Sequence, residues 1–391
     1  MNLTLLLIPL FFIAIASGFL LGRLDGRRRQ KKRVSSITRD YARGLNFLLG
    51  EQPDRAMETF VGSLEVNEHT FETHLALGRL FRRRGEIDRA TTIHQNLLDS
   101  GELSEALYQD VELELARDFL AAGLYDRAEI LFQKMVEAGG RHAAEAMRQL
   151  MHIFETEKDW NSALAVGEKL RRHDASVNPV LAHYCCELAI GLQRADETNA
   201  ARRVLRRALS FDSQCARASE LQGRLEMSQQ NWSQALRFFK RIRRQDTAFF
   251  DEVLDDIETC YRRLEREEEL VQYLLQCSID QPSTALVLKL AGQLRERLGE
   301  KEAAEFIQRY LQSHPSVRGL REFVEMNMGR TDIGDTGQFA IMRQLTDRLL
   351  ERNVEYQCRQ CGFESQALHW HCPGCKSWGT IRRRDQDPVT S

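Results

Sequence analysis

The sequence has little proline, almost no net charge and none of the common hydrolase or nucleotide-binding motifs. Only 7 of its 391 residues are proline, while leucine, alanine, arginine and glutamate are abundant, which argues against a β-sandwich or a disordered chain and favours long helices. A formal net charge of −2 gives no overall attraction for nucleic acid. There is no GxSxG nucleophile motif, no glycine-rich phosphate loop and no HExxH motif. We therefore expect neither an enzyme nor a nucleic-acid-binding protein.

The N-terminal segment is a long stretch without charge. Residues 3–21 carry no charged side chain, and about 20 residues of helix at about 1.5 Å each span the hydrocarbon core of a bilayer. We predict a transmembrane anchor at residues 1–22. A cleaved signal peptide is the alternative, because Ala14 and Ala16 offer a cleavage site. No Lys or Arg precedes the apolar run, which favours the anchor.

A basic juxtamembrane segment is predicted at residues 23–36. Its first part, residues 23–33, holds seven basic side chains and one acidic one, a net charge of +6 that leaves about −8 for the rest of the chain. Positive charge is retained on the cytoplasmic side of a membrane and attracts anionic lipids. We expect a single-pass membrane protein with everything after Arg23 in the cytoplasm, and therefore no disulfides among its nine cysteines.

A repeat of about 34 residues runs through the middle of the chain. One position of the repeat is small in successive units, at Ala56, Ala90, Ala128, Ala163, Ala201 and Ala235. Twelve residues earlier, a second small position recurs at Gly44, Gly78, Ala116 and Gly223. Large apolar residues follow three positions after it, at Phe47, Phe81 and Phe119. Small residues let two antiparallel helices cross closely, and the phenylalanines fill the space beside the contact.

This is the tetratricopeptide pattern, in which each unit is a pair of antiparallel helices. It predicts an all-α superhelical solenoid at residues 37–315, with about eight units of which the last two are degenerate. A generic helical bundle is the alternative. Three arginines of the second unit, Arg79, Arg82 and Arg83, are expected to face the concave surface, where they would suit an acidic partner. The alternative is a solvated basic face without a partner.

A linker and a docking helix are expected at residues 316–352. The sequence GRTDIGDTG at 329–337 is typical of a flexible joint. Residues 339–352 return to a helical period, with an apolar stripe of Ile341, Leu345 and Leu349. We expect this helix to dock on the last repeats or on the C-terminal module.

Four cysteines near the C-terminus have the spacing of a metal site. Cys358 and Cys361 form one CxxC pair, and Cys372 and Cys375 form a second after ten intervening residues. Four thiolates make a closed tetrahedral site that suits Zn²⁺, with a rubredoxin-type iron centre as the alternative. The rubredoxin-like or zinc-ribbon module at 353–380 is too short to build a core, so the metal must hold it together.

The residues around these cysteines have expected roles as well. Gly362 and Gly374 are expected to permit the tight turns of the two CxxC segments. The aromatic residues Tyr356, Phe363, Trp370 and Trp378 are expected to pack around the metal. His369 and His371 are not expected to be ligands, because four cysteines already close the coordination shell. A closed shell also argues against hydrolytic catalysis, and residues 381–391 are expected to be a disordered tail.

The order of these parts resembles the lipopolysaccharide assembly protein B family of Gram-negative bacteria. The resemblance covers nearly the whole chain and is sharpest in RDYARGLNFLL (39–49), LGRLFRRRGEIDRATTIHQ (77–95), AAGLYDRAE (121–129), HYCCELA (183–189) and the segment 358–378. It implies that Cys358, Cys361, Cys372 and Cys375 are the family's metal ligands, and it supplies no catalytic residue.

The resemblance also implies an inner-membrane adaptor that is not an enzyme. In that family the protein presents LpxC, the lipid A deacetylase, to the membrane protease FtsH, and a PbgA/YejM-type inner-membrane regulator restrains it. The expected partners are therefore FtsH, LpxC, such a regulator and inner-membrane lipids, and self-association stays open. Two other hypotheses are a scaffold that assembles lipopolysaccharide synthesis and export proteins at the inner membrane, and a redox protein that uses the CxxC pairs.

Overall fold

The computed structural model describes residues 43–44, 46–47, 55, 59, 70–100, 104–328, 336–352 and 354–384. The predicted anchor at 1–22 and the basic segment at 23–36 lie outside these residues. Among the helices that are described, none is long and apolar enough to cross a membrane. The chain divides into two compact units, Met1–Ile153 and Phe154–Ser391.

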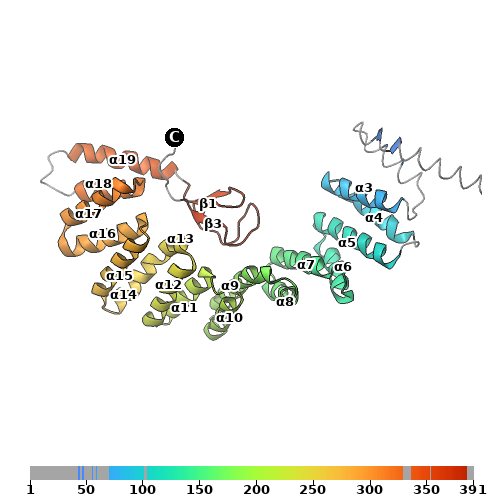
Figure 1. Ribbon diagram of the computed structural model, residues 1–391, viewed down its shortest axis with the longest axis horizontal. Coiled ribbons are helices and arrows are strands. Elements are labelled where there is room, and N and C mark those ends of the chain that lie inside the picture. Colours follow the sequence, from blue (N-terminus) through green and yellow to red (C-terminus); the bar gives the residue numbers. More distant parts are fainter. Residues whose placement is uncertain are drawn as a thin grey trace, which may run out of the picture. The chain divides into compact units, whose positions relative to one another are not determined.

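The first unit consists of antiparallel helices. α3 (Phe71–Arg83) packs against α4 (Ile87–Asp99), and α5 (Glu105–Ala121) packs against α6 (Tyr125–Ala138), as Figure 1 shows. α7 (Ala143–Glu157) ends just inside the second unit.

The small residues of the repeat lie where paired helices cross, as the periodicity predicts. Ala90 and Ala128 are fully buried. A Cβ atom at Gly78 would lie 2.3 Å from Nε2 of His94, so α3 and α4 approach each other at a position that only glycine allows. The large apolar residues Phe81 and Phe132 are fully buried in the same unit.

The second unit continues with further helical pairs. They are α8 (Trp160–Leu170), α9 (Asn178–Arg194), α10 (Thr198–Phe211), α11 (Ala216–Ser228), α12 (Trp232–Gln245), the short α13 (Thr247–Phe250), α14 (Leu254–Arg263), α15 (Glu267–Asp280), α16 (Thr284–Leu298) and α17 (Glu300–Ser313). Single 3₁₀ turns precede α9 and α14, at Ala175–Val177 and Asp251–Val253.

In six of the helix pairs, a recurring turn joins the first helix to the second. One residue in each turn has a left-handed backbone, with φ between +56° and +81°, and these residues are Gly85, Gly123, Lys158, Asp196, Gln230 and Glu265. The next residue donates its N–H to the carbonyl five positions before it, from Glu86 at 2.9 Å to Arg266 at 3.0 Å. The bond satisfies a free carbonyl at the end of the first helix. The turn at Glu265 shows that the pair α14–α15 is regular, although the sequence repeat blurs there.

Two helices follow the array, α18 (Val317–Met328) and α19 (Thr336–Arg352). α19 packs against α18, where Asp347 pairs with Arg321 at 2.7 Å and Thr346 is buried. The apolar stripe lies on another side of the helix, because its members are 52–60% exposed: Ile341, Leu345 and Leu349. α19 therefore contacts α18 through a more polar side, which offers an ion pair.

The C-terminal module is a three-stranded antiparallel sheet of order β2-β1-β3. β1 (Tyr356–Cys358) pairs with β2 (Glu364–Ser365) and with β3 (Ile381–Arg383), and Cys358 lies opposite Ile381. The expectation of a disordered tail from residue 381 is therefore wrong at its first residues. Ile381 is only 1% exposed because it completes the small core of the module.

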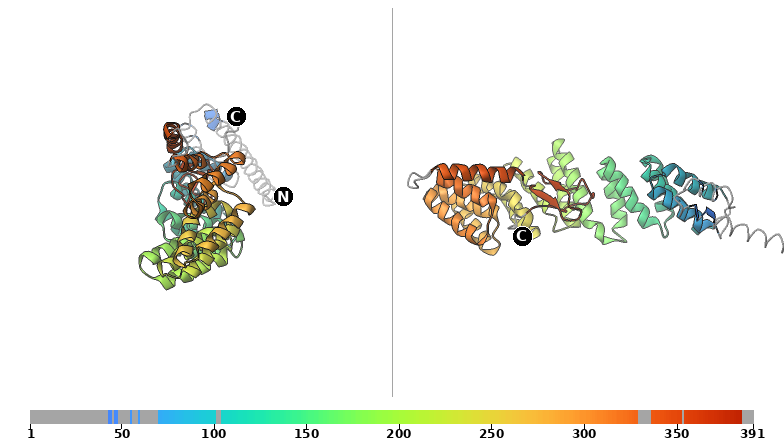
Figure 2. Two further views of the ribbon diagram at one scale, coloured as in Figure 1. Left: turned by 90° about the vertical axis from the view of Figure 1, so that its left-hand side faces the viewer. Right: turned by 90° about the horizontal axis from the view of Figure 1, so that it is seen from above.

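The module lies beside the helices α9 to α13 of its own unit, as Figure 2 shows from above. Its side chains reach α9 through His183, α11 through Arg217 and α13 through Phe249. The sheet and the array are thus packed together within the second unit.

Candidate metal centre

The four predicted ligands meet at one point of the C-terminal module. All four Sγ atoms lie within 4.8 Å of one another. Cys358 Sγ is 3.8 Å from Cys375 Sγ, and Cys361 Sγ is 3.7 Å from Cys372 Sγ. A tetrahedral Zn²⁺ ion with Zn–S bonds of about 2.3 Å puts its sulfurs about 3.8 Å apart. The residues therefore fit a tetrahedral metal ion. A set of four thiolates accepts either zinc or iron, and the spacing does not distinguish them.

Each CxxC pair forms the same tight turn. The N–H of the first cysteine donates to the carbonyl five residues further on, at 2.8 Å for Cys358 and 2.9 Å for Cys372. The residue four positions after each cysteine donates back to its carbonyl, from Gly362 at 3.0 Å and from Lys376 at 2.9 Å. Both donors have a left-handed backbone, with φ of +78° and +58°. The expected role of Gly362 in the turn is confirmed.

Gly374 serves a different purpose from Gly362. A Cβ atom at Gly374 would lie 3.2 Å from Cys361 Sγ and 3.4 Å from Cβ of Phe363. A side chain there would press on a ligand, so this glycine makes room for the sulfur cluster.

The sulfurs differ in how readily they ionise. Burial raises the pKa of Cys358, but a 3.2 Å hydrogen bond with Thr380 and bonds from backbone N–H groups outweigh burial and bring that pKa to about 6. At Cys361 the N–H of Phe363 favours the thiolate, yet burial and the neighbouring sulfurs raise the pKa to about 11. Four negative charges this close repel one another, so full ionisation needs a cation between them.

The tryptophans of the module point to the array rather than to the metal. Tyr356 and Phe363 do pack around the buried cysteines. Trp370 instead packs on Phe249 of α13, with ring centroids 4.7 Å apart, and belongs to the apolar cluster of the array. Trp378 also lies against the array. The expectation that both tryptophans surround the metal is wrong, because the array offers them aromatic partners that so small a module lacks.

Trp378 lies between two histidine rings. It stacks on His183 of α9 at 5.0 Å and on His371 of the module at 4.6 Å, with interplanar angles of 18° and 26°. The guanidinium of Arg217 lies 5.7 Å from the ring centroid of Trp378. His183 is buried, and desolvation together with the nearby positive charges of Arg217 and Arg382 lowers its pKa to about 3. His183 is therefore neutral in the folded protein.

The carboxylate of Glu155, in the last turn of α7, joins both sides of this contact. Glu155 Oε2 accepts hydrogen bonds from Tyr184 at 2.6 Å and from Nε1 of Trp378 at 3.0 Å. Its other oxygen lies 2.8 Å from Nε2 of His371. Burial raises the pKa of Glu155, but the bonds from His371, Tyr184 and Trp378 lower it below its usual range. His371 thus contacts the array, and it is not among the residues grouped around the metal position.

A second set of polar contacts lies at β1 and β3. Arg382 pairs with Asp246 at 2.8 Å, and Nε of Arg383 lies 3.1 Å from Glu252 Oε1. The hydroxyl of Tyr356 donates to Glu252 Oε2 at 3.0 Å. These ion pairs are half-buried, and they fix the sheet on the segment between α12 and α14.

Sequence reasoning missed Glu155, His183 and Arg217 as residues that hold the module. Their partners are far away in the sequence, 223 residues in the case of Glu155 and Trp378. The segment 183–189 stood out only through its resemblance to a family. Buried polar residues such as His183 and Arg217 give no periodic signal that would mark them as a contact.

The three arginines of the predicted partner surface lie in the first unit. Arg82 is half-buried, and it donates to Asp118 Oδ1 at 2.8 Å and to Glu114. Arg79 is exposed, and its Nη2 also lies 3.0 Å from Glu114. Arg83 is exposed and has no partner among the described residues. Two of the three therefore join α3 to α5, and their binding of a partner stays a prediction.

Comparison with known proteins agrees with the two parts of this structure. Residues 356–383 match the family described as a rubredoxin metal binding domain, and residues 186–248 match a tetratricopeptide repeat family. These matches confirm an all-α tetratricopeptide solenoid with a C-terminal metal-ribbon module. A solved tetratricopeptide repeat protein from Parabacteroides merdae covers 71% of this chain and 99% of its own, with 11% identity and a TM-score of 0.33.

Two relatives match this chain along nearly their whole length. Lipopolysaccharide assembly protein B of Escherichia coli strain K12 is 32% identical over 384 residues, which are 98% of each chain. The protein of the same name from Haemophilus influenzae is 30% identical over 391 residues, which are 97% of this chain and 98% of that one. Identity at this level along the whole length confirms the resemblance inferred from the sequence. The chain belongs to the lipopolysaccharide assembly protein B family.

Proposed function

We propose that this chain is a regulatory adaptor of lipopolysaccharide biosynthesis at the inner membrane. The observation that carries the proposal is its similarity, over 98% of the chain, to a protein named for lipopolysaccharide assembly. The adaptor presents the deacetylase LpxC to the protease FtsH, so that LpxC is degraded. A PbgA/YejM-type membrane regulator restrains this action.

The architecture supports a binding role rather than a catalytic one. Helical repeats form extended surfaces for other proteins. The four cysteines would hold a metal ion in a closed shell, where the ion links the two CxxC turns and leaves no position for a substrate. The contact of Trp378 with Glu155 and His183 then keeps the metal module on the array.

The uncharged segment at residues 3–21 supports the membrane part of the proposal. An anchor would confine the adaptor to the same bilayer as a membrane protease. Confinement raises the effective concentration of the two proteins for each other. A variant without residues 1–22 is expected to fold and to lose control of the LpxC level.

The proposal is tested by stopping translation and measuring the half-life of LpxC. Depletion of this chain should lengthen the half-life of LpxC, and the difference should vanish when FtsH is inactive. An unchanged half-life combined with impaired lipopolysaccharide export would favour the scaffold hypothesis instead.

The redox hypothesis is tested on the purified protein. The adaptor proposal expects stoichiometric zinc and no visible absorption from an iron–thiolate centre. Stoichiometric iron that changes oxidation state reversibly would support electron transfer by the CxxC pairs.

A further inference from the structure

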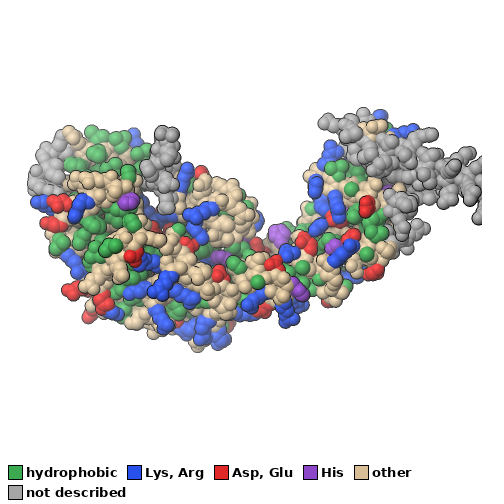
Figure 3. All heavy atoms as spheres, viewed as in Figure 1, with side chains coloured by type: hydrophobic (Ala, Val, Ile, Leu, Met, Phe, Trp, Pro, Cys, Tyr) green, Lys and Arg blue, Asp and Glu red, His purple; other side chains and the backbone are tan. Residues whose placement is uncertain are grey.

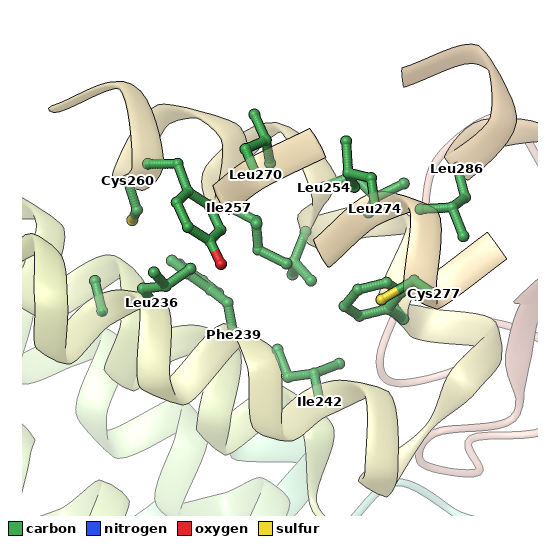
Figure 4. Packing of buried hydrophobic residues seen from close by; sticks show 14 of the residues in the cluster. Leu236, Phe239, Ile242, Leu254, Ile257, Cys260, Leu270, Leu274, Cys277 and Leu286 are labelled. Carbon is green, nitrogen blue, oxygen red and sulfur yellow. The ribbon is translucent and has the colours of Figure 1, made fainter. Parts of the chain in front are cut away.

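α12 is the most basic helix of the second unit, and its cations lie on one side. Its sequence WSQALRFFKRIRRQ contains no acidic residue and five basic ones: Arg237, Lys240, Arg241, Arg243 and Arg244. Lys and Arg side chains gather along the lower edge of the array over this region in Figure 3. The apolar residues Leu236, Phe239 and Ile242 point into the core that α12 shares with α14 and α15, as Figure 4 shows.

A groove of about 860 Å³ lies over this basic side. All five cations of α12 line it, and its other side is formed by α15 and the residue after it, with Tyr273, Asp280 and Gln281. Small-molecule sites in proteins have volumes of about 300–1,000 Å³. The groove is therefore large enough for a ligand of small-molecule size.

The positive charge of the groove is largely uncompensated. Asp280 is its one lining carboxylate, and Asp280 pairs with Arg243 at 2.7 Å. Within the described residues, no carboxylate pairs with Arg237, Arg241 or Arg244. Lys240 lies 4.5 Å and 4.9 Å from the ring centroids of Tyr273 and Tyr261, so aromatic faces hold its ammonium group.

Helix electrostatics explains only part of this charge. Cations are favourable in the last turn of a helix, which accounts for Arg243 and Arg244. Arg237, Lys240 and Arg241 lie earlier, and like charges three or four residues apart repel each other on a helix. An anion bound in the groove would relieve that repulsion.

The density of charge favours phosphate over carboxylate. Arg237 and Arg244 are seven residues apart, which is about 10 Å along the helix. An extended acidic peptide places one negative charge about every 7 Å on one side of its backbone. A phosphate group brings about two charges to one point and accepts paired hydrogen bonds from a guanidinium. We propose that the groove over α12 binds a phosphate-bearing ligand, either a free phosphorylated molecule or the headgroup of a phospholipid.

The test uses the full-length protein in a neutral detergent. Inorganic pyrophosphate is titrated as a free probe, and phosphatidic acid in the detergent micelles is titrated as the lipid probe. The test variant is Arg237→Gln with Arg241→Gln. The matched control is Arg203→Gln with Arg206→Gln, which removes the same charge from exposed positions of α10. Circular dichroism verifies that both variants are folded.

The wild-type protein and the control should bind at least one probe, and the test variant should bind it at least about tenfold more weakly. The probe with the higher affinity identifies the source of the phosphate. Equal weakening in both variants would overturn the proposal, because only net charge would then matter. Binding of a polyglutamate peptide, lost in the test variant and without binding of either phosphate probe, would assign the groove to an acidic protein segment instead.

Discussion

At the scale of single residues, the carboxylate of Glu155 contacts three side chains where the metal module meets the array. It contacts Tyr184 from α9, and Trp378 and His371 from the module. These bonds lower the pKa of Glu155 although burial opposes them, so the group stays charged at neutral pH. Because three donors converge on it, its loss leaves several polar groups without their partner.

Glu155→Gln tests this role. The amide keeps one acceptor oxygen but loses the charge that faces His371, so the free energy of unfolding of the second unit should fall by about 1–3 kcal/mol. Chemical denaturation followed by tryptophan fluorescence measures the change. Glu157→Gln is the matched control, since Glu157 is exposed on the same helix and should have little effect. Equal stability of the two variants would contradict the assignment.

His183 makes the contact between the metal module and the array sensitive to acid. Its pKa is about 3 in the folded protein against 6.5 for a free histidine, because burial and neighbouring cations disfavour its charged form. Between these values the unfolded chain binds a proton that the folded chain does not, so stability falls as the pH drops below about 6.5. The loss approaches about 1.4 kcal/mol per pH unit.

Unfolding midpoints at about pH 7.5 and about pH 5.5, one unit above and one unit below the pKa of a free histidine, measure this dependence. His183→Gln should show a smaller fall between these pH values than the wild-type protein. Metal content is followed in parallel, because thiolate ligands also take up protons in acid. The same dependence in both proteins would exclude His183 as its source.

At the scale of helices, close crossing sets the pairing in each repeat. A Cβ atom at Gly223 of α11 would lie 2.4 Å from the ring of Phe239 on α12. Gly191 of α9 is an exposed helical glycine with nothing within 4 Å of its Cβ position. The two glycines therefore have opposite consequences for stability.

Gly223→Ala should destabilise the protein by about 1–3 kcal/mol, because α11 and α12 would have to separate or Phe239 to leave its rotamer. Gly191→Ala should stabilise it by about 0.5–1 kcal/mol, since alanine has the higher helix propensity. Thermal unfolding of both variants measures the difference. A loss of stability at Gly191 equal to that at Gly223 would show that the helix crossing is not the cause.

Much of the helix pairing was predictable from the sequence, for reasons that the structure shows. Small residues recur at positions where paired helices cross, so the spacing of Ala90 and Ala128 predicted which helices pair. The turns were harder to locate, because Lys158 and Glu265 hold the left-handed conformation that glycine holds at Gly85. The docking side of α19 was not predictable, since an apolar stripe does not reveal which neighbour a helix meets.

At the scale of the whole molecule, the metal module and the array are joined by contacts between residues far apart in the sequence. The spacing of the four cysteines alone predicted that their sulfurs meet at one point, because a CxxC turn needs no distant residue. The place where the module docks could not be predicted, since it depends on pairs such as Tyr356 and Glu252, 104 residues apart. Even β3 was missed, because a strand of three residues gains its stability from β1 rather than from its own composition.

Cys372→Ser should release the metal and loosen the module, because a thiolate ligand is lost from the tetrahedral set. Trp370 and Trp378 should then become exposed, with a shift of tryptophan emission to longer wavelength. Metal analysis and fluorescence measure both effects. Arg359→Gln is the control, an exposed position between two ligands, and it should keep its metal. Full metal content in Cys372→Ser would refute the ligand set.

The hydrogen bond between Trp378 and Glu155 has a mechanical consequence. In a repeat array each unit generally touches only its neighbours, so the stability of a unit depends on the units next to it. Here a contact across 223 residues closes the chain from the end of α7 to the module into a loop. A pull on the C-terminus would load the module and its contact with Glu155 before it loaded the helical pairs between them.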